Sequence, residues 1–398
     1  LESYALLPPE GVASRIVCEL KDNPLFVIPD SERGGVLETA LAARPDRRSE
    51  SFQTFLAGNL SPKSKTIYEG LLAAYKGDWR KVVRHVQVER FFVSRRFRVG
   101  ALVTKPQGTA DAQIPPITGD AAAAGLPAFL QSVPIYELLG DLPDANRGLL
   151  EFSDFLKRNL ELSKYLLQTT EKGFVTVANQ LVELDIVFAA TVNELHLEAF
   201  KQIGDFSSFQ GRMTFIRVPY MREIEKEARV YRRICDELAR SHAVAPHVPE
   251  ALALFAVLSR LHRPDADAYP EASKGLIEGI SPLEKAWLYA EGRVPDRLSP
   301  AAGRELLRLL PKLRDEYADS ETYEGRYGAS VRDLRATLLR VAARNKAFIG
   351  PGELVEELAE MTRDRSVYAF LQLEPEGDYH DPDAMLAATR EQLAAWIL

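Results

Sequence analysis

The apolar pattern of the chain changes near Pro219, and this change limits the possible folds more than any other feature of the sequence. Before it, short and nearly continuous apolar runs alternate with stretches of helical spacing, as in an α/β domain with a covered, mostly parallel sheet. After it, the apolar residues have helical spacing. The sequence therefore predicts an α/β domain followed by a region made only of helices.

Five short apolar runs are the candidate strands of the first region. They are Ser3 to Leu7, Leu25 to Ile28, Gly148 to Phe152, Leu184 to Thr191 and Met213 to Val218. The longest stretch between them, Thr104 to Gly125, is rich in Pro, Gly and Ala and is predicted to be a loop.

The second region holds six predicted helices and, after a polar loop, a closing helix near the end of the chain. The six run from Arg222 to His242, Pro249 to His262, Glu284 to Tyr289, Gly303 to Tyr317, Ser330 to Asn345 and Gly352 to Asp364. From these patterns we divide the chain into an α/β core at 1–235, a helical domain at 236–350 and a C-terminal helical extension at 351–398.

Composition and charge argue against several classes of protein. Apolar residues make up 46% of the chain and charged ones 27%, which is typical of a soluble folded protein. A net charge of −7 disfavours a general nucleic-acid binder, which needs a surplus of Lys and Arg. No stretch reaches the roughly 18 apolar residues of a membrane span, and Cys18 and Cys235 have no metal-ligand or redox spacing. We therefore expect a cytoplasmic protein that does not contact a membrane.

The predicted strand from Gly148 to Phe152 ends in acids. Glu151 lies within it, and Ser153 and Asp154 follow it. A nucleotide hydrolase needs carboxylates at such a strand end, one to hold Mg²⁺ through its waters and one to polarise the attacking water. The same residues are also expected where a strand is followed by a helix that begins with Asp, because a negative charge stabilises a helix N-terminus. Both interpretations stay open for this segment taken alone.

The predicted strand from Leu184 to Thr191 also ends in polar side chains, Thr191 itself and then Asn193. An Asn at this place can reach both a γ-phosphate and the attacking water. As an alternative, Asn193 caps the helix that follows it.

Two arginines complete the pattern. Arg212 lies just before the predicted strand at Met213 to Val218, where it can be offered to the nucleotide of a neighbouring subunit. Arg332 follows Ser330 at a predicted helix start and can face a phosphate. As alternatives, Arg212 is an ordinary surface residue and Ser330 is a helix cap.

In this order and spacing, the four features resemble the second half of an AAA+ module: Walker B strand, sensor-1 strand, arginine finger, and a helical lid with a sensor-2 arginine. The segment Tyr165 to Val177 resembles the hairpin that precedes sensor 1 in the MoxR, magnesium-chelatase and MCM branch. The resemblance implies a three-layer αβα domain with a helical lid, and ATP and Mg²⁺ as cofactors. It places Asp154, Glu151, Asn193 and Arg212 in catalysis, Arg332, Ser153 and Thr191 at the nucleotide, and Glu151 and Asp154 at the metal.

A closer resemblance is to the PrkA-type serine protein kinases. It extends from about residue 4 to residue 345 and is carried by Asn146-Arg147-Gly148-Leu149-Leu150-Glu151-Phe152, Val88-Glu89-Arg90-Phe91-Phe92, Asn193-Glu194, Val218-Pro219-Tyr220, Ala245-Pro246-His247 and Leu258-Ser259-Arg260-Leu261. The resemblance implies an ATP-binding serine protein kinase or ATPase in bacterial stress or developmental signalling. Because an arginine that acts in trans needs a second subunit, we also expect a homo-oligomer, a ring or a dimer, with a protein as substrate or partner.

The chain departs from the AAA+ pattern in two places and from the protein-kinase pattern in a third. It contains no G-x-x-x-x-G-K-[ST] phosphate-binding loop, and under the resemblance it begins at the second strand, beyond that loop. Ser153 stands where the metal-holding Asp is expected. The H-R-D-x-x-x-x-N, D-F-G and V-A-I-K motifs of the protein-kinase fold do not occur.

These departures keep a second hypothesis open, that of a non-catalytic AAA-like oligomeric protein with a regulatory or scaffold role. A third hypothesis, DNA remodelling as in the MCM proteins, rests only on the hairpin before sensor 1. The sequence pI of about 5.6 disfavours it.

Overall fold

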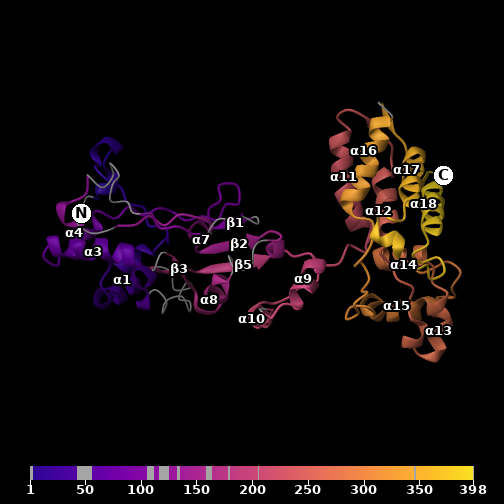
Figure 1. Cartoon of the computed structure of the whole chain (residues 1–398), viewed down its shortest axis with the longest axis horizontal. Helices are drawn as coiled ribbons and strands as arrows, with labels where there is room; N and C mark the ends of the chain where they lie inside the picture. The colour runs from indigo at the N-terminus through magenta and orange to yellow at the C-terminus, as the bar shows by residue number, and fades with distance from the viewer. Residues whose placement is uncertain are drawn as a thin grey trace. The chain divides into compact units, whose positions relative to one another are not determined.

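Figure 1 shows the computed structural model of the chain. It describes residues 3–42, 56–104, 112–115, 125–131, 135–157, 164–177, 180–204, 206–344 and 347–397. The chain forms two compact units, Leu1–Phe215 and Ile216–Leu398. Each unit has a hydrophobic core of its own.

The first unit is built on a parallel sheet of three strands in the order β1-β2-β5. The strands are β1 (Ala101–Thr104), β2 (Gly148–Phe152) and β5 (Ile186–Ala190). Leu102, Leu150 and Phe152 of this sheet are buried in the core of the unit. The sheet confirms the predicted α/β class, and β2 and β5 confirm two of the five predicted strands.

The other three predicted strands are wrong. Ser3 to Leu7 holds a 3₁₀ helix, Tyr4–Leu6, because the hydroxyl of Ser3 accepts a hydrogen bond from the backbone N–H of Ala5. Leu25 to Ile28 overlaps a second 3₁₀ helix, Pro24–Val27, which Asn23 caps in the same way. Local side-chain caps therefore hold both segments in tight turns, although their apolar residues favour strands.

Met213 to Val218 is not a strand either. Ile216 and Val218 are 80% and 82% exposed, so the apolar pattern of this segment does not reflect burial. Conversely, β1 was not predicted, because Ala101–Thr104 is short and becomes a strand through its pairing with β2. The predicted loop from Thr104 to Gly125 follows it, and residues 105–111 and 116–124 of that loop lie outside the described residues.

A hairpin precedes β5, as the sequence predicts. Helix α8 (Tyr165–Lys172) ends at Gly173, which has a positive φ of 70°, and β3 (Phe174–Val177) then pairs antiparallel with β4 (Gln180–Glu183). The remaining α-helices in the described part of the first unit are α1 (Asp30–Ala42), α3 (Pro62–Ala74), α4 (Trp79–Val83), α6 (Ala128–Gln131), α7 (Asp141–Ala145), α9 (Glu194–Lys201) and α10 (Phe206–Gln210).

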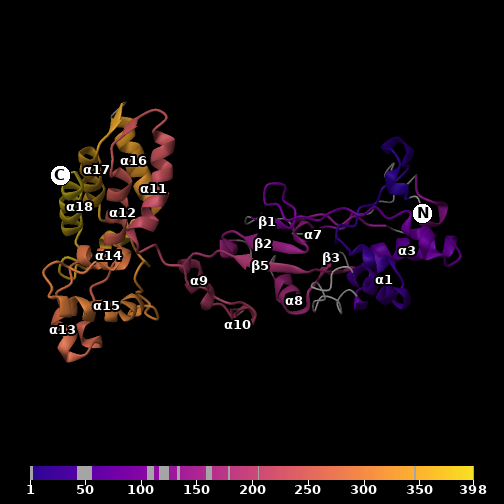
Figure 2. The same ribbon diagram turned by 180° about the vertical axis from the view of Figure 1, so that it is seen from behind.

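The second unit is a helical bundle, which Figure 2 shows from behind. Its helices are α11 (Ile224–Leu238), α12 (Val248–Leu258), α13 (Glu271–Glu278), α14 (Pro282–Glu291), α15 (Pro300–Asp315), α16 (Val331–Arg344), α17 (Pro351–Arg363) and α18 (Pro382–Ile397). All six predicted helices and the closing helix are confirmed, and α13 is an additional one.

Helix α12 is the centre of the bundle, because its apolar side chains are buried all the way round. It packs against α11, α14, α16, α17 and α18. A short parallel pair, β6 (Ala243–Val244) with β7 (Phe348–Ile349), joins the segments that precede α12 and α17. Helices on both sides of residue 350 thus share one core, and the division into a lid and a C-terminal extension stays a prediction. Within the described residues, no helix is both long and apolar enough to cross a lipid bilayer.

Candidate functional site

The loop before β2 holds the sheet in register. The side-chain amide of Asn146 donates to the carbonyl of Leu20 at 2.7 Å, and its oxygen accepts from the backbone N–H of Asp185 at 2.7 Å. Gly148 lies so close to the neighbouring strand that an added Cβ would sit 1.8 Å from the carbonyl oxygen of Gly100. The Asn146-Arg147-Gly148 segment therefore supports the site by positioning β2 between β1 and β5.

Lys21 closes the end of α7 next to this loop. Its ammonium group donates to the carbonyl oxygens of Pro143, Asp144 and Asn146 at 2.9 to 3.0 Å. Burial lowers the pKa of Lys21 below its ordinary value. The lysine therefore acts as a cap on carbonyls, as a cation at a helix C-terminus should.

The carboxyl ends of the three strands stay linked beyond the regular sheet. The N–H of Ser153 donates to the carbonyl of Thr104 at 2.9 Å, and the N–H of Thr191 donates to the carbonyl of Phe152 at 2.9 Å. The N–H of Phe155 then returns to the carbonyl of Thr191 at 3.0 Å. These bonds bring Ser153 and Thr191, two of the predicted site residues, to one edge of the sheet.

Asp154 occupies a left-handed turn at this edge, with φ of 52°. Its backbone N–H donates to the hydroxyl oxygen of Thr191 at 3.1 Å, and its carboxylate forms a salt bridge with Lys157 at 3.0 Å. Asp adopts this backbone region more readily than most residues, and such turns are common at functional sites. The side chain of Asp154 is 40% exposed, so a ligand can reach it.

Glu151 lies on the other face of β2 from the core, because side chains alternate along a strand and Leu150 and Phe152 are buried. It is half-buried and pairs across the sheet with Val103 and Ala189. Among the described residues, no group of three side chains is placed to hold a metal ion. Mg²⁺ is usually held by one or two carboxylates together with substrate phosphates and waters, so the donor type of Glu151 and Asp154 suits this ion.

Asn193 is at the N-cap position of α9, but its side chain makes no capping hydrogen bond. Its side chain is exposed. Asn193 therefore occupies the position that the capping alternative predicts, but its side-chain amide does not cap the helix.

Arg212, the first of the two predicted arginines, makes its contacts within the first unit. Arg212 donates to the carboxylate of Glu171 at 3.0 and 2.6 Å and to the carbonyl of Ser208 at 2.7 Å. The hydrogen bond from Arg212 lowers the pKa of Glu171. In this structure Arg212 thus has a partner within its own chain, as the surface-residue alternative expects.

Arg332 lies in the second unit, exposed in the first turn of α16. The helix start beside it is a reciprocal cap, in which the N–H of Asp333 donates to the hydroxyl of Ser330 at 3.2 Å. The N–H of Ser330 donates in turn to the carboxylate of Asp333 at 3.1 Å. The capping role of Ser330 is confirmed.

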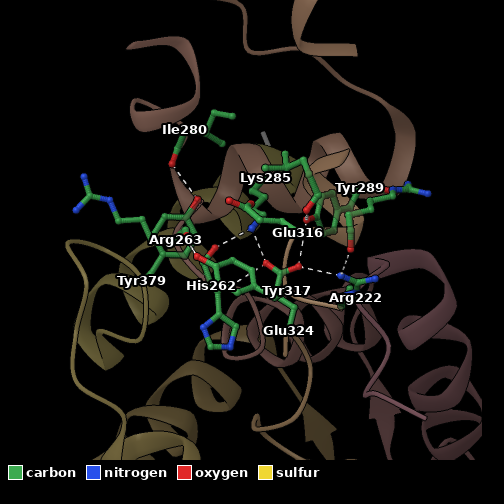
Figure 3. Close-up of polar contacts among 12 residues, drawn as sticks. Arg222, His262, Arg263, Ile280, Lys285, Tyr289, Glu316, Tyr317, Glu324 and Tyr379 are labelled. Atoms are coloured by element: carbon green, nitrogen blue, oxygen red, sulfur yellow. Dashed lines mark hydrogen bonds and ion pairs between the residues drawn. The ribbon is translucent and has the colours of Figure 1, made fainter. Parts of the chain in front are cut away.

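The second unit also contains a buried ionic cluster that the sequence did not predict (Figure 3). The carboxylate of Glu324 accepts from Lys285 and from Arg222, and both Lys285 and Glu324 are almost fully buried. Tyr289 donates its hydroxyl to the same carboxylate at 3.1 Å. Lys285 stands within an otherwise ordinary helix, and nothing in its neighbours along the chain indicates a buried partner 39 residues away.

The first unit has a parallel sheet with carboxylate, hydroxyl and amide side chains at its carboxyl edge. The model of the PrkA AAA domain matches residues 9–267, so this part of the chain is an α/β domain of the AAA class. The model of the PrkA serine protein kinase C-terminal domain matches residues 283–397. The chain belongs to the PrkA family.

Curated relatives carry two different descriptions. The chain is 28% identical over 269 residues to the ATP-dependent protease PrkA of Bacillus subtilis. This alignment covers 66% of this chain and 40% of that protein. It is 27% identical over 245 residues to the serine/threonine kinase YeaG of Escherichia coli K12. This second alignment covers 60% of this chain and 34% of that protein. The chain thus spans well under half the length of these relatives.

Solved structures are more distant. The chain is 12% identical to NtrX from Brucella abortus in its complexes with ADP and with ATP, with TM-scores of 0.23 and 0.24. The alignments cover 78% and 92% of this chain and 85% and 86% of those chains. So distant a likeness carries no argument about the site.

Proposed function

We propose that this chain is the ATP-binding AAA module of a PrkA-type serine protein kinase or ATPase that acts in bacterial signalling in the cytoplasm. The observation that carries the proposal is the linked edge of the sheet, where the N–H of Asp154 binds the hydroxyl of Thr191. Through this link the backbone of Asp154 lies beside the strand end that continues into Asn193. Family membership and the names of the relatives support ATP as the ligand.

In this proposal, Asp154 orients the attacking water or hydroxyl and accepts its proton. Asn193 donates from its amide to a γ-phosphate oxygen, and Thr191 and Ser153 hold the strand ends at the nucleotide. Mg²⁺, held by Glu151 and Asp154, would neutralise phosphate charge. These 398 residues contain no G-x-x-x-x-G-K-[ST] to cradle the phosphates.

The test is MgATP binding by calorimetry, together with phosphate release, for the chain and two variants. We expect Asp154→Asn and Asn193→Ala to keep ATP binding and to lose about 100-fold in turnover, because the first removes the general base and the second removes a donor to the transferred phosphoryl group. Glu183→Gln, an exposed change on β4, is the control and should match the unchanged chain. No ATP binding by the chain, or full turnover in Asp154→Asn, would refute the proposal.

A second function is favoured by Ser153, which stands where the metal-holding Asp is expected. In this case the chain is a non-catalytic AAA-like regulatory or scaffold protein that binds nucleotide without turning it over. Ser153→Asp distinguishes the two functions. Activity that appears only in this variant supports the regulatory function, whereas activity in the unchanged chain excludes it.

We further propose that the chain forms a homo-oligomer in which Arg212 reaches the nucleotide of a neighbouring subunit. Its 34% exposed side chain must then exchange Glu171 for phosphate oxygens. We expect Arg212→Ala to bind ATP and assemble normally but to lose turnover, as measured by phosphate release and by mass in solution. Lys172→Ala, a change at an exposed neighbour of Glu171, should retain turnover. Unchanged turnover in Arg212→Ala would exclude this role.

A further inference from the structure

A groove of about 560 Å³ lies in the second unit between α17 and α18. Its polar lining consists of Thr362, Arg363, Arg365, Asp383 and Arg390. The two helices pack side by side, so the groove has walls of regular structure. The volume is in the range of small-molecule sites and well above that of a single small ion.

The basic residues of this region are gathered in the groove. Arg363, Arg365 and Arg390 are the only Lys or Arg residues between 347 and 398, a stretch in which Asp and Glu are in clear excess. Although they are spread over 28 residues of sequence, all three line the same groove. Like charges brought together repel one another unless an anion offsets them.

Acidic side chains neutralise only part of the positive charge of these three arginines. Arg363 forms a salt bridge with Glu360. In the part of the chain that the structure describes, neither Arg365 nor Arg390 forms a salt bridge. The carboxylate of Asp364 is engaged by the hydroxyl of Ser366 at 2.6 Å. Asp383 is the one carboxylate among the described residues that line the groove. The net charge of the groove lining is therefore positive.

We propose that this groove binds the phosphoryl group of a phosphorylated small molecule through Arg365 and Arg390. The planar guanidinium group donates two parallel hydrogen bonds to phosphate oxygens. A phosphate monoester has three terminal oxygens for two arginines, whereas a carboxylate has two. A phosphate monoester carries nearly two negative charges at neutral pH and is attracted by the positive surplus of the groove. Ala359 and Ala387, which also line it and are more accessible than its other apolar residues, would contact the organic part of the ligand.

Calorimetry on the whole chain with phenyl phosphate and with inorganic phosphate tests the proposal. We expect both probes to bind and the double variant Arg365→Ala, Arg390→Ala to weaken binding by about tenfold or more, the loss of one or two charge-assisted bonds. The control is Arg293→Ala, Arg335→Ala, which removes two exposed arginines elsewhere in the same unit. Arg390→Lys keeps the charge and should show an intermediate loss, because it lacks the fork.

The two probes distinguish the sources of the phosphoryl group. Tighter binding of phenyl phosphate indicates an organic phosphate, and equal binding indicates free phosphate. Circular dichroism of the double variant checks that α17 and α18 still form. Equal affinity in the double variant and the unchanged chain, or no binding of either probe, would overturn the proposal.

Discussion

Single charged residues strongly affect the stability of the second unit, because several of them are buried. Burial raises the pKa of Glu324, but the Lys285 ammonium and the hydrogen bonds to the carboxylate outweigh it, so the net pKa is lowered. The charge on Glu324 thus persists because Lys285 and Arg222 surround it. A buried pair of this kind contributes little compared with apolar residues, yet losing one partner is costly.

Glu324→Gln should therefore strongly destabilise the second unit. It leaves the Lys285 ammonium buried without its counter-ion, and we expect a loss of about 3–5 kcal/mol in the free energy of unfolding. Urea unfolding followed by circular dichroism measures it. Adding Lys285→Met removes the unpaired ammonium group and should restore most of the lost free energy of unfolding. Glu291→Gln, an exposed change at the end of α14, should have almost no effect. Equal stability of the single and double variants would contradict this account.

A histidine pair next to this cluster predicts a pH dependence. Nε2 of His380 lies 3.3 Å from Nδ1 of His262. Burial, and then the charge of His380, lower the pKa of His262 from 6.5 to about 4. Between these values the unfolded chain binds a proton that the folded chain does not, so stability is lost as the pH falls from 6.5 toward 4.

Unfolding free energies measured from pH 7 to pH 5 should therefore decrease, and His262→Gln should decrease less over the same range. His196→Gln, in the other unit, is the control and should follow the unchanged chain. A His262→Gln variant with the same pH dependence as the unchanged chain would show that this histidine is not the group responsible.

At the scale of elements, helices are set by local signals, and these were largely predictable. Helix α14 starts with Ser281, whose hydroxyl accepts from the N–H of Glu284 at 3.3 Å. The carboxylate of Glu284 accepts in return from the N–H of Ser281 at 3.0 Å. Pro282 follows the cap, and Gly292 ends the helix with φ of 68°. Each of these signals lies within a few residues of the helix end that it determines.

Ser281→Ala should remove one side of this capping box and destabilise the second unit by about 1 kcal/mol. Chemical unfolding measures the change. Ser281→Thr keeps the hydroxyl and is the matched control, with an expected loss of only a few tenths of a kcal/mol. If both variants lost the same stability, packing at this position, rather than the cap, would be responsible.

Strands depend on partners far along the chain, and here prediction was less successful. Ala101–Thr104 forms β1 because each of its residues pairs with a residue of β2 that lies 48 positions later, and not because of its own residues. Met213 to Val218 has a better apolar pattern but no pairing strand in the described chain. A strand needs its neighbour, whereas a helix satisfies its backbone within itself.

At the scale of the whole molecule, the two units place the domain boundary at Phe215 and Ile216, whereas the sequence pattern suggested 235. Helix α11 lies between these positions and belongs to the bundle. Its Tyr231 is fully buried, and its Glu227 forms a buried salt bridge with Arg260. Glycine at position 328 also leaves room for Arg260, because an added Cβ would lie 2.3 Å from the arginine side chain.

A fragment of residues 216–398 should therefore fold on its own and unfold in one cooperative transition. A fragment of residues 236–398 should not, because it lacks α11 and leaves the Arg260 guanidinium buried without Glu227. Circular dichroism during thermal unfolding measures both. A cooperative transition of the shorter fragment would support the boundary at 235 and contradict the one at 215.

The sequence by itself determined the order of an α/β part and a helical part, the helices of the second unit, and the polar ends of β2 and β5. These features depend on residues close together in the chain, whose spacing and caps act locally. Only the tertiary structure decided which apolar runs pair as strands, that Arg212 meets Glu171, and that three distant arginines share one groove. Such contacts join residues separated by many others, and their energies exist only once the chain has folded to bring them together.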